Sequence, residues 1–203
     1  TFTFTPTAND NQWVEAEATM PDGRRIFATN SFTGTTPNIT WVDDAAPAGS
    51  EAGSDNGDPW AWNWQSSNPT PHSGQFAFQS AIVPGEHQYL FLNATATMNV
   101  PTGATLYAWI YIDQANPPSE VMLQWNDGSS WNHRAYWGAN NLTYGTDGTA
   151  SRHYMGPLPA AGQWVKLAVP ASAVGLEGAT ANGMGFTLFG GRATWDDIGE
   201  TTQ

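Results

Sequence analysis

Apolar and polar residues alternate in short runs along most of this 203-residue chain, and glycine, proline, asparagine and aspartate separate the runs. Because successive side chains of a strand point to opposite faces, a period of two indicates strands with one buried face. Almost no stretch shows the period of an amphipathic helix. We therefore expect an all-β protein, a two-sheet β-sandwich with jelly-roll topology.

The expected strands follow one another closely from residue 38 onward. We place them at 39–44 and near 60–65, 75–82, 87–99, 104–113, 119–127, 131–137, 150–155, 163–169, 183–189 and 193–199. The last two are joined through Gly190 and Gly191 and should form a closing hairpin. These strands make residues 38–203 the main, jelly-roll domain.

Residues 1–37 are expected to form a β-rich N-terminal appendage or the end of a preceding domain. Residues 1–6, 13–19 and 24–28 predict strands, and Pro21-Asp22-Gly23 predicts a turn. The segment 2–23 resembles the last hairpin of a bacterial immunoglobulin-like or PKD-type domain, in which an aromatic-Thr-Pro segment is followed by a turn and a strand ending in Asp-Gly. The resemblance implies further domains in a longer chain. The alternative is that these strands extend the main sandwich.

The charge balance excludes several kinds of partner. The net charge is −12, and the six basic residues are scattered along the chain. Nucleic-acid binding needs a basic stripe that neutralises phosphates, so we expect no nucleic-acid partner and no anionic membrane or acidic polysaccharide. No run of about 18 apolar residues is present that could span a membrane. The acidic excess suits neutral ligands or divalent cations.

The low content of charged residues and the lack of cysteine further narrow the class of protein to which the chain can belong. Charged residues make up 12% of the chain and cysteines are absent. The missing cysteines exclude disulfides, zinc–thiolate sites and cysteine nucleophiles. A surface rich in Thr, Ser, Asn and Gly is typical of extracellular β-proteins. We read the chain, which starts at Thr1, as part of a longer mature protein that is secreted or at the cell surface.

Aromatic residues provide the first candidate binding surface. The chain holds 11 tryptophans, more than a core of this size usually needs. Residues 106–113 alternate, with aliphatic side chains on one face and Tyr107, Trp109 and Tyr111 on the other. Alternate residues of a strand lie about 6.6–7 Å apart, so the three rings can stack against successive sugar rings. The alternative is that a long loop or the N-terminal segment covers them.

A predicted hairpin over residues 120–137 provides the second candidate binding surface. A three-residue loop at Gly128–Ser130 pairs Trp125 with His133 and Val121 with Trp137 on an apolar face. The opposite face pairs Gln124 with Arg134 and Met122 with Tyr136, with Glu120 beyond. Planar polar side chains among aromatic rings suit the hydroxyl groups of sugars. The alternative is an exposed Glu120–Arg134 ion pair. The candidate carbohydrate-binding residues are Tyr107, Trp109, Tyr111, Gln124, Arg134, Tyr136 and Glu120.

A third aromatic group is Trp60-Ala61-Trp62-Asn63-Trp64, whose tryptophans share one face of a strand. It is expected either to close the core as an edge strand or to form an aromatic clamp carried by a loop.

Acidic residues cluster at the expected first and last strands of the main domain. Because these strands are neighbours in a jelly roll, Asp43, Asp44, Asp196 and Asp197 should converge, with Asp55 and Asp58 in the loop that follows. Converging carboxylates repel one another unless a cation binds them, and calcium accepts irregular sets of oxygen ligands. The alternative is that these acids are solvated in loops.

The last strand resembles that of the calcium-stabilised jelly-roll carbohydrate-binding modules. In those modules the strand commonly ends aromatic-x-Asp-Asp-Ile/Val, and here Trp195-Asp196-Asp197-Ile198 stands in that place, with the aromatic residue directly before the two aspartates. The resemblance implies a jelly-roll fold and a structural calcium ion, with an aspartate of the last strand as the usual ligand.

We therefore expect a non-catalytic carbohydrate-binding module that anchors a larger secreted protein to a neutral polysaccharide. Its expected partners are a polysaccharide or oligosaccharide and other domains of the same chain. One alternative is a structural or adhesive domain of a bacterial surface protein. Another is a jelly-roll polysaccharide lyase that uses Gln124, His133, Arg134 and Tyr136. A glycosidase needs two carboxyl groups beside the bond, and the expected patch offers Glu120 and at most Asp113.

Overall fold

The computed structural model describes residues 11–33, 38–53 and 63–201, which fall into a unit up to Pro37 and a unit from Asn38. Within the described residues the secondary structure is almost entirely strand, with one short 3-10 helix, η1 (Ala171–Val174). The expectation of an all-β fold is therefore confirmed. In those same ranges no helix has the length and apolar character needed to cross a membrane.

The first unit is an antiparallel hairpin of β1 (Asn11–Thr19) and β2 (Arg25–Thr33). Gly23 has φ +81°, a conformation that glycine adopts without strain, and Asp22 accepts a hydrogen bond from the Arg24 backbone N–H at 3.1 Å. The turn therefore lies where Pro21-Asp22-Gly23 predicts it. That the hairpin ends a preceding domain stays a prediction, and the expected strand at 1–6 lies outside the described residues.

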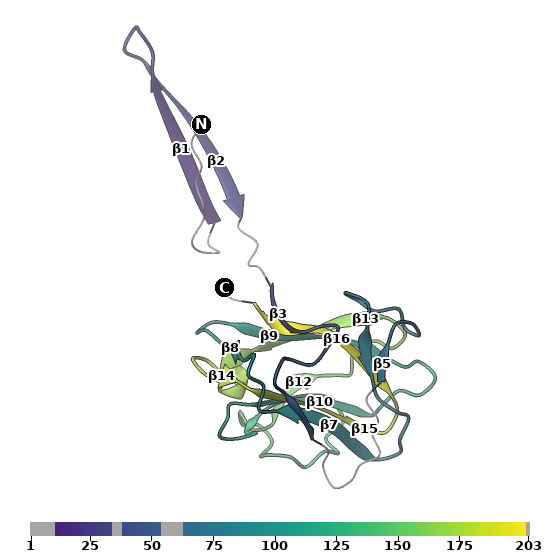
Figure 1. Cartoon of the computed structure of the whole chain (residues 1–203). Helices are drawn as coiled ribbons and strands as arrows, with labels where there is room; N and C mark the ends of the chain where they lie inside the picture. The colour runs from purple at the N-terminus through teal and green to yellow at the C-terminus, as the bar shows by residue number, and fades with distance from the viewer. Residues whose placement is uncertain (1–10, 34–37, 54–62, 202–203) are drawn as a thin grey trace. The chain divides into compact units, whose positions relative to one another are not determined.

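The second unit is a β-sandwich of two six-stranded sheets, seen in Figure 1 as two layers. We call one the β10 sheet; its order is β12 (His153–Gly156), β11 (His133–Gly138), β10 (Glu120–Asn126), β15 (Gly183–Phe189), β7 (Glu86–Leu92) and β4 (Glu51–Gly53). The β9 sheet has the order β13 (Trp164–Pro170), β9 (Thr105–Ile112), β16 (Ala193–Thr201), β6 (Ala77–Gln79) and β5 (Asn63–Gln65), and β3 (Asn38–Val42) also pairs with β16. β8 (Met98–Asn99) and β14 (Thr180–Ala181) form a separate pair.

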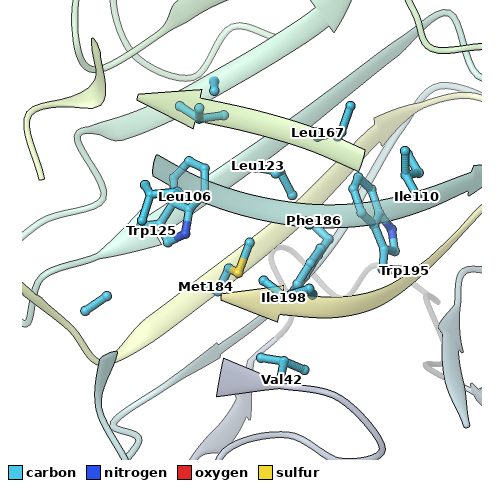
Figure 2. Packing of buried hydrophobic residues seen from close by; sticks show 14 of the residues in the cluster. Val42, Leu106, Ile110, Leu123, Trp125, Leu167, Met184, Phe186, Trp195 and Ile198 are labelled. Atoms are coloured by element: carbon cyan, nitrogen blue, oxygen red, sulfur yellow. The ribbon is translucent and has the colours of Figure 1, made fainter. Parts of the chain in front are cut away.

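The inward faces of the two sheets form one apolar core. Leu106 and Ile110 of β9 lie opposite Leu123 and Trp125 of β10, and Trp195 of β16 packs nearby (Figure 2). The expected aliphatic face of 106–112 and the expected apolar face of the 120–137 hairpin are therefore confirmed.

The pairing of β10 with β11 also has the predicted register. Trp125 pairs with His133, Gln124 with Arg134 and Val121 with Trp137. This register fixes which side chains of the hairpin point outward, and so it positions the candidate site described below. The expected neighbourhood of the first and last strands is confirmed too, because β3 pairs with β16.

Two other expected strands, 87–99 and 60–65, differ from the structure in detail. The expected strand 87–99 is two strands, β7 and β8, and Asn93 between them has φ +59°. Trp60 and Trp62 lie outside the described residues. Trp64 is half-buried in β5 and stacks on Phe78 with ring centroids 4.5 Å apart, as an edge strand closing the core would.

Candidate functional site

Four polar side chains form a connected floor on the outer face of the β10 sheet. Gln124 donates hydrogen bonds through Nε2 to Gln88 Oε1 at 2.9 Å and to Thr187 Oγ1 at 2.7 Å. The Arg134 guanidinium donates from Nε to Gln124 Oε1 at 2.6 Å. All four are buried, and they come from β7, β15, β10 and β11. A network of hydrogen bonds among buried polar side chains fixes the orientation of its members.

An open pocket of about 230 Å³ lies above this floor. We call it the Arg134 pocket; it is lined by Gln88, Leu90, Gln124, Trp131, Arg134 and Tyr144. Gly185 creates part of its space, since this residue of β15 pairs with Gln124 on one side and Leu90 on the other. A Cβ at Gly185 would lie 3.4 Å from the Gln124 side chain. The missing side chain therefore leaves a hollow between the two neighbouring strands.

Two aromatic residues from loops border the pocket. Trp131 lies in the loop between β10 and β11, and Tyr144 lies in the loop between β11 and β12. The Tyr144 hydroxyl donates to Glu86 Oε1 at 2.6 Å and accepts from Gln88 Nε2 at 3.0 Å. The Tyr144 ring is thereby fastened to β7, and its centre lies 5.8 Å from the Arg134 guanidinium carbon.

Glu120 and Tyr136 were expected at the binding patch, and the structure places both beneath the loop that follows β11. Glu120 is 0% exposed, and its Oε2 accepts from the backbone N–H groups of Asn141 at 2.5 Å and Leu142 at 2.9 Å. Tyr136 is 3% exposed and donates to Asp147 at 2.8 Å. Neither lines the pocket, so their expected exposure is wrong. They hold the loop that carries Tyr144.

The alternative of an exposed Glu120–Arg134 ion pair is also wrong. The described ion pairs do not include it, and both side chains are buried. Burial raises the pKa of the Glu120 carboxyl, while the two backbone N–H groups act in the opposite direction.

The row of Tyr107, Trp109 and Tyr111 lies on the outer face of the β9 sheet, as expected, but other residues cover two of its rings, Tyr107 and Trp109. Tyr107 is 0% exposed, and its hydroxyl donates to Asp197 Oδ1 at 3.1 Å. Burial raises the pKa of Tyr107 to about 12. The His72 ring stacks on Trp109 with centroids 3.7 Å apart. An open three-ring platform is therefore wrong, and the alternative of a covering loop holds for Trp109.

Tyr111 borders a second, smaller pocket of about 190 Å³ on the same face. Asp113 and Arg192, which also line it, form an ion pair with each other. The charges of Asp113 and Arg192 therefore neutralise each other, whereas the Arg134 charge has no carboxylate partner among the described residues.

The four acids expected to bind metal do converge where β3 ends beside β16. Asp44 Oδ1 accepts from the backbone N–H groups of Gln75 at 2.6 Å and Phe76 at 2.8 Å. Asp196 Oδ2 accepts from those of His72 at 2.7 Å and Ser73 at 3.0 Å. These carboxylates therefore fasten the loop that carries His72 over the β9 sheet.

The convergence does not by itself make a metal centre. Oδ1 of Asp43 is buried without a hydrogen-bond partner, but the described residues contain no group of three or more His, Cys, Asp or Glu side chains arranged to hold a metal ion. Asp55 and Asp58 lie outside the described residues. Calcium at Asp43, Asp44, Asp196 and Asp197 stays a prediction.

Proton sharing between Asp43 and Asp196 predicts a pH-dependent stability. Burial raises the pKa of Asp196 to about 6 and also raises that of Asp43, which lies within hydrogen-bonding distance. Since the folded state holds the proton more tightly than the unfolded chain, this contribution is complete below about pH 4 and is lost as the pH rises through about 6. Asp43→Asn supplies a neutral donor to Asp196. In calcium-free buffer we expect it to flatten the dependence of the free energy of unfolding on pH and to raise that free energy at pH 7 by about 1 kcal/mol.

Urea denaturation between pH 4 and pH 8 measures this effect. Asp22→Asn in the hairpin unit removes an equal charge at an exposed site and is the control. An unchanged pH profile for Asp43→Asn would show that the two carboxyl groups do not share a proton.

Comparison with known proteins supports the fold. No family model matches the chain, and no curated protein matches it. A solved chain from a study of the promiscuous specificity of carbohydrate-binding modules of the β-sandwich superfamily has a TM-score of 0.51 at 12% identity, covering 98% of this chain and 77% of that one. At this identity the likeness shows a shared β-sandwich fold and no more.

Two further solved structures fall just below a TM-score of 0.5. The K1 cleaved adhesin domain of Lys-gingipain from Porphyromonas gingivalis W83 has a TM-score of 0.49 at 13% identity, over 84% of this chain and 99% of that one. The family 11 carbohydrate-binding module from Clostridium thermocellum, in complex with a β-1,3-1,4-mixed-linked tetrasaccharide, has 0.46 at 10% identity, over 80% and 94%.

Proposed function

We propose that the second unit binds a saccharide chain in the Arg134 pocket, without catalysis, and so holds a larger secreted protein at a polysaccharide. The observation that carries the proposal is the combination of two loop-borne rings, Trp131 and Tyr144, with a floor of amide and guanidinium groups. Sugars present apolar ring faces and pairs of hydroxyls, which match aromatic surfaces and planar polar groups respectively. The β-sandwich fold shared with a carbohydrate-binding module supports this reading.

The chemistry of the pocket favours binding over bond cleavage. Its six described lining residues include no carboxylic acid, whereas glycoside hydrolysis commonly needs two. His133, the base considered for a lyase, faces the core side of the hairpin. Its ring nitrogens lie 2.7 Å from Val174 O and 3.3 Å from Asp127 Oδ2, so both are already engaged.

The net charge of −12 supports a polysaccharide that is neutral along most of its length. A densely charged acidic polymer would be repelled at every sugar. A purely structural or adhesive domain remains the alternative function, and it requires no saccharide binding at this pocket.

Trp131→Ala tests the proposal. Loss of ring stacking is expected to weaken binding of whichever glycan the wild type selects on a glycan array by about tenfold, since an aromatic contact contributes about 1–2 kcal/mol. The matched control is Trp109→Ala in the opposite sheet, which should retain binding and lose thermal stability because His72 stacks on that ring. Weaker glycan binding by Trp109→Ala, together with unchanged binding by Trp131→Ala, would contradict the proposal and indicate a saccharide site on the β9 sheet.

We also propose calcium as a structural ion, on the resemblance of the last strand and the convergence of the four acids. If calcium binds there, EDTA should lower the melting temperature by several degrees at pH 7, since about 1 kcal/mol corresponds to roughly 2–4 °C for a chain of this size. The Asp196→Asn variant should show a smaller response to EDTA. A melting curve that EDTA leaves unchanged, with no metal found by elemental analysis, contradicts the proposal.

A further inference from the structure

Arg134 differs from the other basic side chains of the described residues. Four of the six basic side chains form ion pairs with carboxylates, namely Arg24, Arg25, Arg152 and Arg192. Lys166 is exposed and lies 4.2 Å from the centre of the Tyr107 ring. Arg134 is 8% exposed and has no carboxylate within ion-pair distance among the described residues. It is therefore a buried cation that the described part of the protein does not neutralise.

The partners of Arg134 are neutral oxygens on one part of its guanidinium. Nε donates to Gln124 Oε1 at 2.6 Å, and Nη1 donates to the Ser151 backbone carbonyl at 3.2 Å. No hydrogen bond to the described residues involves Nη2, and the side chain lines the open pocket. Glu86 of β7 accepts from the hydroxyl of Tyr144, which lines the pocket, and forms no ion pair with Arg134.

An unneutralised cation at the wall of an open pocket is a docking point for an anion. Removing a charge from water is costly unless a counter-charge and hydrogen bonds replace the lost hydration. A carboxylate in the pocket supplies both, and its planar geometry matches the guanidinium fork. Gln124 and Ser151 already fix the orientation of Arg134, so little side-chain entropy is lost when the anion binds.

We propose that the Arg134 pocket takes a uronic acid residue, whose carboxylate pairs with Arg134 while Trp131 and Tyr144 flank the sugar ring. This inference rests on the proposed function and names the sugar class for the same site. The net charge of −12 disfavours a polymer that is charged at every sugar. The ligand is therefore a mostly neutral chain with isolated uronates, of which one enters the pocket.

The test changes the ligand and leaves the protein intact. The probes are xylotetraose carrying one glucuronate substituent, the same compound with its carboxylate methyl-esterified, and unsubstituted xylotetraose. Tetraglutamate tests a carboxylate without sugar. At low salt, wild-type protein should bind a uronate probe at least about tenfold more tightly than its ester, and added salt should narrow the difference.

Protein variants give an independent readout. Arg134→Gln should remove the preference for the acid over the ester, Arg134→Lys should retain part of it, and Arg192→Gln on the opposite sheet should leave it unchanged. Equal binding of acid and ester by the wild type overturns the inference even if the Arg134 variants fail to fold.

The remaining outcomes separate this inference from the proposed function. Binding of neutral glycans alone overturns the uronate and leaves saccharide binding in place. Binding of tetraglutamate as tightly as the uronates overturns the assignment to a sugar. Binding of no glycan, acidic or neutral, overturns the proposed function and this inference together.

Discussion

Truncation of Trp195 to alanine is expected to lower the free energy of unfolding by about 3–5 kcal/mol. This ring lies on β16 between the two sheets, is 0% exposed, and packs on Phe186 with ring centroids 5.2 Å apart (Figure 2). Its Nε1 is buried and has no hydrogen-bond partner among the described residues, so the loss comes from packing and the cavity. Because domains are stable by about 5–15 kcal/mol, much of the stability should disappear.

Equilibrium urea denaturation gives the measurement. Trp164→Ala is the matched control, since that ring is half-buried at the edge strand β13. Trp164→Ala should lower the free energy of unfolding clearly less than Trp195→Ala does. A loss below about 1 kcal/mol for Trp195→Ala would contradict a core centred between these sheets.

Gly185→Val is expected to abolish saccharide binding, with at least a tenfold loss of affinity, while the fold is retained. The valine side chain would occupy the hollow between Gln124 and Leu90 that opens the Arg134 pocket. The first atom, Cβ, meets Gln124 at 3.4 Å, a contact that a small shift relieves, and valine favours strand conformation.

A graded series makes this prediction sharper. Gly185→Ala adds one carbon and should weaken binding less than Gly185→Val, and both should keep the melting temperature within a few degrees of the wild type. Wild-type affinity in Gly185→Val would contradict ligand entry at this pocket. Tyr111→Ala, at the pocket of the opposite sheet, should bind as the wild type does.

The register of the β10–β11 hairpin could be predicted because two local signals agree. Alternation decides which side chains share a face, and the short loop at Gly128–Ser130 decides which residues pair. Gln124 and Arg134 therefore meet at the site as expected, side by side on the outer face.

The covering of Tyr107 and Trp109 could not be predicted from the same alternation. A period of two separates the faces of a sheet, but it does not show which loops pack over the outer face. Here the cover is the loop with His72, about 35 residues away in sequence from the ladder it covers, together with β3. The acids interpreted as metal ligands fasten this loop through Asp44 and Asp196. The covering of the ladder thus depends on hydrogen bonds from this loop to two of the four converging acids.

The aromatic border of the Arg134 pocket was missed for a related reason. Extending the alternation of the hairpin from His133 back to Trp131 puts Trp131 on the core face, but the alternation does not apply in the loop where Trp131 lies. Tyr144 lies in a loop with no periodic pattern, and its place depends on the hydrogen bonds that the backbone N–H groups of Asn141 and Leu142 donate to buried Glu120. Gln88 and Leu90 do share the outward parity of β7, so alternation over residues 86–92 carries a signal for them.

The most direct test of saccharide binding in the Arg134 pocket is an NMR titration of the whole chain with the bound glycan, following indole N–H and side-chain amide signals. Binding at the proposed place predicts that the Trp131 indole and the amides of Gln88 and Gln124 shift, while the indoles of Trp109 and Trp164 do not. Shifts confined to Trp109, Trp164 and the backbone around Asp113 would contradict it and place the ligand on the β9 sheet.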